Sequence, residues 1–205
     1  MIEARTGIEA FESGGRQGWA RGFVVTTRDI LKAPTETFSA MDREGSVGLP
    51  LLFALLVSVL PEVLTTTIEL ASPGALGWFG PGLEGDMAAR WAGVGEYWLL
   101  LGGMFASDVL ITAPMLWAML KLTGQRCPPL RAIFRVACYS GAPTLLAPGL
   151  LASAVVGLWG LFLLCVGVKA IGGPRPIGVF GALAVGQIGG LGIAMVLSLI
   201  YNSIT

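Results

Sequence analysis

The chain has 205 residues, of which 54% are hydrophobic and only 13% charged, and its mean hydropathy is +0.76. Soluble domains carry about 25% charged residues, so this composition indicates a membrane protein with several spans. The formal net charge is zero, and no strongly basic surface that would favour a nucleic-acid partner is present.

The sequence also lacks the side chains that several reaction classes need. It contains no histidine, which removes the usual general base and the commonest zinc and haem ligand. Three cysteines, Cys127, Cys138 and Cys165, show no Cys-x-x-Cys spacing. Neither a phosphate-binding Gly-x-x-x-x-Gly-Lys loop nor a Gly-x-Ser-x-Gly elbow occurs. We therefore expect no enzymatic activity, no cofactor and no metal site.

Residues 1–46 are predicted to form a cytosolic segment. Residues 1–18 are polar and contain adjacent glycines, which favours a flexible or partner-dependent tail. Apolar residues from Trp19 to Leu31 recur at roughly helical spacing between basic ones, which predicts an amphipathic helix. That helix would lie on an anionic leaflet or pack against a partner. A second short helix is expected from Pro34, with Phe38 on its apolar side.

Residues 47–205 are predicted to form a domain of five transmembrane helices. The 33 residues between Arg135 and Lys169 carry no formal charge. As one helix they would extend ~50 Å, well beyond a hydrocarbon core of ~30 Å. A break at Ala147-Pro148-Gly149 would divide them into two antiparallel helices. The other expected spans are Leu49–Leu70, Tyr97–Leu122 and Ile177–Tyr201.

Acidic residues inside two of these spans are the candidates for intramembrane chemistry. In the first span, Glu62, Thr66 and Glu69 fall on one face, and Asp108 lies near the middle of the second. A carboxyl group in a span needs a partner, so these groups would bond hydroxyls, share a proton or line a cation path. Pro61 should also free the carbonyl of Val57 for another partner.

Basic residues predict the orientation of the chain. Lys and Arg side chains number twelve on one side of the predicted spans and one on the other, so the N-terminus is expected in the cytosol and the C-terminus outside. Arg126, Arg131 and Arg135 are expected on the cytosolic side, where they would contact lipid head groups or an acidic partner.

The last expected span carries small residues at intervals of four. Such a stripe lets another helix backbone approach closely, which favours packing within the bundle or between protomers, or else lines a path. Its members include Gly178, Ala182, Gly186, Gly190 and Ala194.

One stretch resembles a known family. Residues 133–143 read IFRVACYSGAP and precede an apolar hairpin that contains Trp159; upstream, PTETF begins at Pro34. Both patterns are similar to those of the Yip1 domain. The family motif residues in this chain would be Pro34, Phe38, Phe134, Arg135, Tyr139, Pro143 and Trp159.

The resemblance implies a five-span membrane protein that acts as a scaffold or adaptor. In this chain, abundant alanine and glycine and short loops indicate a bacterial protein. We therefore expect an accessory or assembly subunit of the cytoplasmic membrane. Its partners would be membrane lipids and other membrane proteins or further copies of itself. Two alternatives remain open: a small transporter or channel that uses Glu62 and Asp108, and a lipid-binding or membrane-shaping protein.

Overall fold

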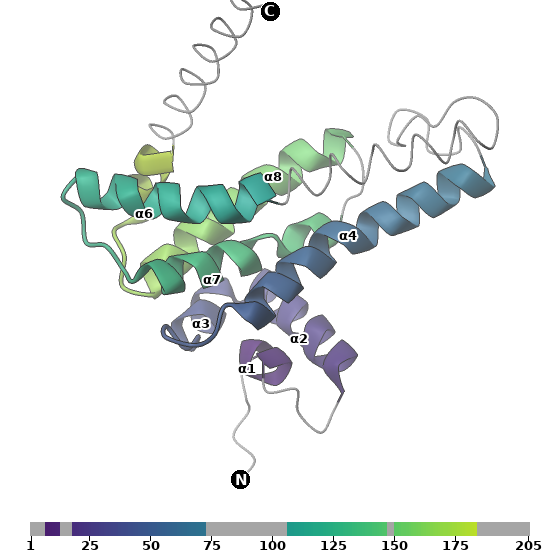
Figure 1. Ribbon diagram of the computed structural model, residues 1–205, viewed down its shortest axis with the longest axis horizontal. Coiled ribbons are helices and arrows are strands. Elements are labelled where there is room, and N and C mark those ends of the chain that lie inside the picture. Colours follow the sequence, from purple (N-terminus) through teal and green to yellow (C-terminus); the bar gives the residue numbers. More distant parts are fainter. Residues whose placement is uncertain (1–6, 13–17, 73–105, 147–149, 184–205) are drawn as a thin grey trace, which may run out of the picture.

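The computed structural model describes residues 7–12, 18–72, 106–146 and 150–183 (Figure 1). Every regular element in these ranges is helical, which confirms the predicted all-α class. The elements are α1 (Gly7–Glu12), α2 (Trp19–Lys32), α3 (Pro34–Ser39), α4 (Gly48–Ala71), the π-helix η2 (Ala106–Ile111), α6 (Thr112–Leu122), α7 (Leu130–Ser140), the 3-10 helix η3 (Ala142–Leu146) and α8 (Leu150–Ala170). Residues 176–183 are also helical.

Helix α7 lies at the centre of the described structure. Eight of its eleven residues are buried, and it packs against α4, α6 and α8. In Figure 1, α6 lies on one side of the α7–α8 pair, and α1, α2 and α3 lie on the other. The stretch that stands out in the sequence is therefore the element around which the other helices assemble.

Helices α7 and α8 run antiparallel, as the sequence predicts. A Cβ atom at Gly160 would lie 3.3 Å from the carbonyl oxygen of Ser140, and one at Gly167 would lie 2.5 Å from Cγ1 of Val136. Higher residue numbers on α8 therefore lie opposite lower residue numbers on α7, so the two helices run in opposite directions. The hairpin is confirmed, and the two glycines allow its helices to approach closely.

The first helix of this hairpin ends earlier than predicted. The α-helical part stops at Ser140, and the chain continues as η3. Pro143 explains the change, because proline lacks the N–H group and disfavours helical geometry in the residue before it. The amide of Thr144 bonds the carbonyl of Gly141 instead, at 3.0 Å. The predicted break at residues 147–149 lies outside the described residues.

Helix α4 agrees with the first predicted span to within one residue at each end. Pro61 lies inside it, as the sequence requires. The hydroxyl group of Thr144 donates to the carbonyl oxygen of Val57 at 3.1 Å. The carbonyl that proline frees is thus used to join α4 to η3.

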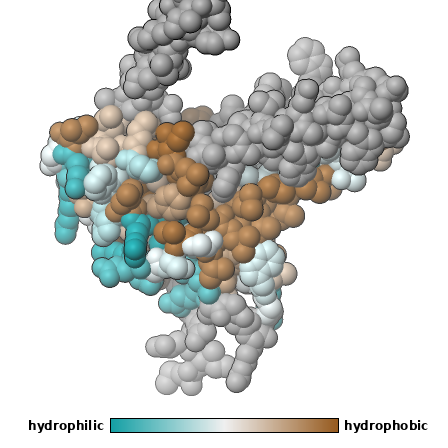
Figure 2. Space-filling model, viewed as in Figure 1, coloured by the Kyte–Doolittle hydropathy of each residue, from teal (hydrophilic) through white to brown (hydrophobic). Residues whose placement is uncertain are grey.

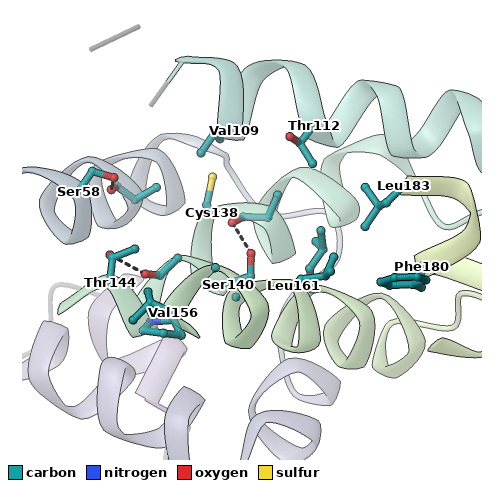
Figure 3. A pocket seen from close by; sticks show the side chains of 17 residues that line it. Ser58, Val109, Thr112, Cys138, Ser140, Thr144, Val156, Leu161, Phe180 and Leu183 are labelled. Atoms are coloured by element: carbon teal, nitrogen blue, oxygen red, sulfur yellow. Dashed lines mark hydrogen bonds between the residues drawn. The ribbon is translucent and has the colours of Figure 1, made fainter. Parts of the chain in front are cut away.

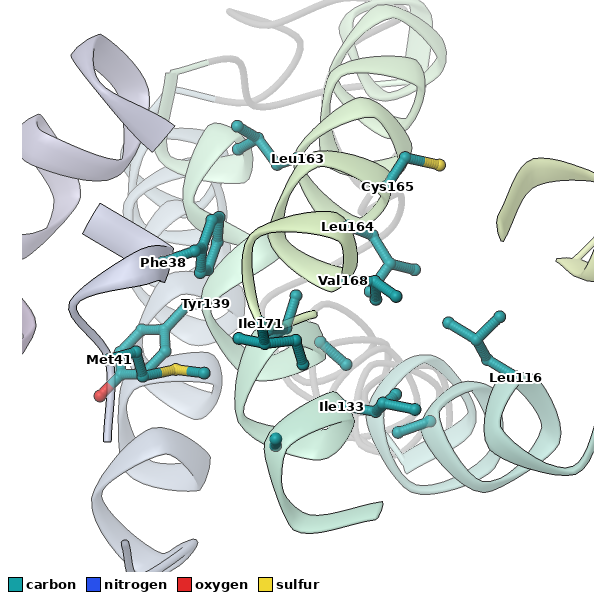
Figure 4. Close-up of a cluster of buried hydrophobic side chains, with 14 of the residues drawn as sticks. Phe38, Met41, Leu116, Ile133, Tyr139, Leu163, Leu164, Cys165, Val168 and Ile171 are labelled. Carbon is teal, nitrogen blue, oxygen red and sulfur yellow. The ribbon is translucent and has the colours of Figure 1, made fainter. Parts of the chain in front are cut away.

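The N-terminal helices are part of the hydrophobic core. Residues 7–12 form α1, so the flexible alternative for the predicted tail is wrong for them. One face of α2, with Gly22, Thr26 and Ile30, is buried against the rest of the chain, whereas Trp19 and Val24 are exposed, so the predicted contact with a leaflet or a partner stays a prediction. Figure 4 shows Phe38 and Met41 of this region beside side chains of α7 and α8. The buried apolar residues contributed by the N-terminal region are Ile8, Phe11, Ile30, Phe38 and Met41.

One described helix is long and apolar enough to cross a membrane. It covers Gly48–Ile68, and only 33% of its apolar window is buried inside the chain. Val109–Leu122 and Val155–Ala170 are shorter apolar helices. In Figure 2, hydrophobic side chains follow α4, and hydrophilic ones gather where α6 turns into α7. Five spans remain a prediction.

The second and fifth predicted spans are described in part. The second contains η2 followed by α6, so a wide helical turn comes just before Pro114. Proline leaves the carbonyl four residues back without its helical bond, which accords with an irregular turn at this point. Residues 97–105 and 184–201 of these spans lie outside the described residues.

Adding one methyl group at Gly167 should destabilise the protein. The new Cβ would overlap Val136 and lie 3.1 Å from Cδ2 of Phe38, at a cost of ~1–3 kcal/mol for overpacking. Gly181→Ala is the matched control, because a Cβ there meets nothing within 4 Å and should gain roughly 0.5–1 kcal/mol. Thermal unfolding followed by size exclusion should show a lower midpoint for Gly167→Ala only. Equal midpoints would contradict the packing of α3, α7 and α8.

Candidate functional site

A buried arginine joins the N-terminal helices to the centre of the bundle. Arg135 and Tyr139 lie one turn apart on α7, so their side chains point to the same side of the helix. Both side chains are 0% exposed. A guanidinium group cannot be neutralised, so its burial requires hydrogen-bonding partners.

Glu12, the last residue of α1, supplies the main partner. Nη2 of Arg135 lies 2.7 Å from both Oε1 and Oε2 of Glu12. The hydroxyl group of Tyr139 donates to Oε1 of the same carboxylate, also at 2.7 Å. The Glu12 side chain keeps 21% of its surface exposed, so the ion pair lies at the edge of the core.

The loop between α3 and α4 covers the other side of the guanidinium group. Nη1 of Arg135 donates to the carbonyl oxygen of Ser46. A Cβ at Gly45 would lie 2.7 Å from Nη1, so glycine leaves the space that the cation occupies. Among the described residues, no group bonds Nε of Arg135. Arg135 thereby contacts α1 and the loop before α4 from its place on α7.

An aromatic cluster shields this ion pair. The ring of Phe53 on α4 lies 4.9 Å from that of Tyr139 and 5.6 Å from that of Phe11, centroid to centroid. Phe23 on α2 lies 5.1 Å from Phe53, and Trp19 stacks on Phe23 at 6.2 Å. Phe11, Phe53 and Tyr139 are fully buried, and their rings exclude water and strengthen the charged hydrogen bonds beside them, whereas Trp19 is exposed at the edge of the cluster.

The two predicted motif segments meet in space. Phe38 is fully buried, and it contacts the position of Gly167 on α8 beside Val136 of α7. Pro143 is buried in η3. Phe134 packs against the core, and Pro34 opens α3. Trp159 differs from the other motif residues, because it lies on α8 with 38% of its surface exposed.

Arg135 does not reach lipid head groups, so that prediction is wrong for this residue. Its full burial and its bonds to Glu12 and Ser46 explain the difference. Arg126 and Arg131 are exposed, and their predicted contacts stay predictions.

Sequence reasoning missed Glu12, which lies 123 residues from Arg135. Two signals could have found it: an arginine inside an apolar stretch needs a partner, and Ile8 and Phe11 precede Glu12 at helical spacing.

Of the predicted intramembrane carboxylates, the structure describes the side chain of Glu62. Glu62 is half-buried, and the hydroxyl of Thr65 lies 3.4 Å from its Oε2. Thr66 is buried, and its hydroxyl has no bond within the described part of the chain. The side chains of Glu69 and Asp108 lie outside the described residues, so the transport alternative stays a prediction.

The small-residue stripe is used inside the chain where the structure describes it. Gly178 faces the side-chain amide of Gln125, which would collide with a Cβ there. Ala182 is 2% exposed. Gly186, Gly190 and Ala194 lie outside the described residues.

Removing either charge of the ion pair should destabilise the protein strongly. Arg135→Met leaves a carboxylate beside apolar rings, and Glu12→Ala leaves a buried cation; removal of one partner of a buried pair costs ~3–5 kcal/mol. Partial exposure of Glu12 places the Arg135→Met loss toward the lower end of that range. The double variant should lose less than the sum of the single ones, measured as thermal midpoints. Additive losses would show that the two groups do not interact.

A comparison with protein-family models matches the region that contains both motif segments. The Yip1 domain model matches residues 28–200, which includes all the motif residues above but not α1 and Glu12. This match also supports membrane-protein character. No curated protein and no solved structure matches the chain. Because the matched region covers most of the sequence and contains both motif segments, the chain belongs to the Yip1 domain family.

Proposed function

We propose that this protein is a non-enzymatic scaffold or accessory subunit of the membrane that acts by binding other membrane proteins. The observation that carries the proposal is the contact between Arg135, Tyr139 and Glu12. A catalytic or transport site needs polar groups that turn toward a ligand. Here the most polar residues of the family motif are directed at the chain itself and hold the N-terminal helices in place.

The exposed apolar surface of α4 is the proposed contact for a partner helix. Only a third of the span is buried inside the chain, so most of it meets lipid or another protein. Its exposed large residues are Leu52, Leu55, Leu60, Val63, Leu64 and Ile68. The described part of the small-residue stripe supports this choice, because Gly178 and Ala182 are already packed internally.

The ion pair also supports a topology. Helix α1 has six residues and extends ~9 Å, too short to cross a bilayer. Glu12 therefore reaches Arg135 from the side on which the N-terminal helices lie. Two crossings between them, through α4 and the segment that ends in α6, fit that arrangement. With the distribution of Lys and Arg, this supports a cytosolic N-terminus in a bacterial cytoplasmic membrane, five spans and an outer C-terminus.

Tryptophan substitutions should reveal the partner face. A bulky ring is tolerated where a helix meets lipid but disrupts a close helix contact. Leu64→Trp on α4, at a position 57% exposed, should reduce the size of the native complex extracted in mild detergent. Leu158→Trp on α8, at a position 69% exposed, is the matched control and should leave that size unchanged. Blue-native gels give the readout. A protein that runs as a monomer, or a complex that neither variant alters, would rule out the scaffold proposal.

The native cysteines offer a test of orientation. Cys127 is half-buried in the loop between α6 and α7, whereas Cys138 and Cys165 are buried. Burial raises the pKa of the Cys127 thiol, and Lys121 lowers it in part, so the reactive thiolate becomes more abundant as the pH rises. At mildly alkaline pH, a charged maleimide should label inside-out vesicles and not intact spheroplasts.

Two controls define the labelling result. Cys127→Ser should abolish the signal, which would assign it to this thiol. Adding Thr205→Cys to that variant should restore labelling in intact spheroplasts, because the C-terminus is proposed to lie outside. Labelling of Cys127 from outside would overturn the proposed orientation.

A further inference from the structure

A cavity of about 510 Å³ lies on the side of α7 away from the ion pair (Figure 3). Its walls come from α4, η2, α6, α7, η3, α8 and residues 176–183. Ala137 and Cys138 of α7 contribute to its wall. The volume lies within the roughly 300–1,000 Å³ typical of pockets that hold small molecules.

The wall of the cavity offers almost no free polar group. Ser58 donates to Ala54 of its own helix at 2.9 Å, and Ser140 donates to Ala137 at 2.8 Å. Thr144 bonds the carbonyl of Val57, and Thr112 also has an interaction within the protein. Among the described residues, no charged side chain lines the cavity. Water gains little from such a wall, so the surface favours an apolar occupant.

The cavity opens toward an apolar surface. Two of its lining residues, Gly157 on α8 and Phe180, are exposed. Beside them in the sequence, Val155, Leu158 and Ile177 are exposed by 67%, 69% and 80%. In a membrane protein, such residues meet hydrocarbon. The opening is therefore placed where a lipid chain can enter directly from the bilayer.

We propose that this cavity binds one acyl chain of a bilayer phospholipid. The chain enters past Gly157 and Phe180 and extends toward Ala137 and Cys138 on α7. Its methylene groups gain dispersion contacts with the apolar wall that water cannot supply. The head group stays outside, because the described wall has no cation to hold a phosphate or a carboxylate. This site is separate from the Arg135 contact and does not depend on the scaffold role.

Photolabelling can test the site directly. The full chain is placed in phosphatidylcholine nanodiscs that contain a small fraction of phosphatidylcholine with a diazirine on one acyl chain. After irradiation, digestion and mass spectrometry, we expect label on residues 137–141 of the α7 end. Bulk lipid cannot reach most of this segment, because Ala137, Cys138 and Ser140 are at most 8% exposed.

Filling the cavity should remove that label. Gly157→Leu adds an apolar side chain at the opening, at a position where its Cβ meets nothing within 4 Å. Labelling of residues 137–141 should fall severalfold, while labelling of exposed residues on α4 stays constant. Gly181→Leu, at an exposed and equally open position that does not line the cavity, should label like the wild type. Ser58→Leu fills the cavity from the α4 wall and covers the case in which Gly157→Leu does not fold.

Three results would overturn the proposal. Label confined to exposed residues in the wild type would show that no chain enters. Unchanged labelling of residues 137–141 in the folded cavity-filling variants would place the chain elsewhere. Label from a free diazirine fatty acid, with none from the phospholipid, would show that the occupant is not a bilayer lipid.

Discussion

A guanidinium group keeps its positive charge, so where water is excluded it needs a negative group and hydrogen-bond acceptors beside it. Much of this fold can be understood from that constraint. Arg135 lies on the most buried helix and is surrounded by aromatic and aliphatic side chains. The carboxylate of Glu12 and the carbonyl of Ser46 solvate it in place of water. Two segments that are remote in sequence, α1 and the loop before α4, therefore have to converge on one point of α7.

Glycines at the contacts between segments make that convergence possible. Gly45 leaves room for the guanidinium group, and Gly22 lets α1 cross α2 at backbone distance, with a Cβ only 3.0 Å from Phe11 Cα. Gly167 lets Phe38 reach Val136. The motif residues thus contribute a charged side chain and aromatic rings that pack against glycines.

Local sequence patterns were sufficient for the helices and for some of their contacts. The apolar run from Leu49 predicted α4, and the length of the uncharged stretch after Arg135 predicted the α7–α8 hairpin. Pro61 also predicted that the carbonyl of Val57 would accept a hydrogen bond from outside its helix, and the hydroxyl of Thr144 donates that bond. These features depend on neighbours in the sequence, where backbone chemistry and periodicity act directly.

The centre of the site was less accessible, because it depends on pairing between distant residues. The helical spacing of Ile8 and Phe11 before Glu12 shows a helix face but not its partner 123 residues away, and charge alone predicted Arg135 at a lipid surface. The early end of α7 could have been predicted, because Pro143 breaks a helix and is visible in the sequence. The cavity wall needs seven helical segments in their final positions, which no single-sequence pattern supplies.

The distance of 123 residues between Glu12 and Arg135 also has a consequence for biogenesis. Helix α1 leaves the ribosome early, but its carboxylate has no cation to meet until α7 has been synthesised and the preceding helices have been inserted. Closure of the N-terminal helices over α7 through this pair can therefore follow only after α7 is made, and in the proposed topology both residues lie on one face of the bilayer. A chain whose insertion leaves α1 and Arg135 on opposite faces of the bilayer would lack the carboxylate that balances the buried charge of Arg135.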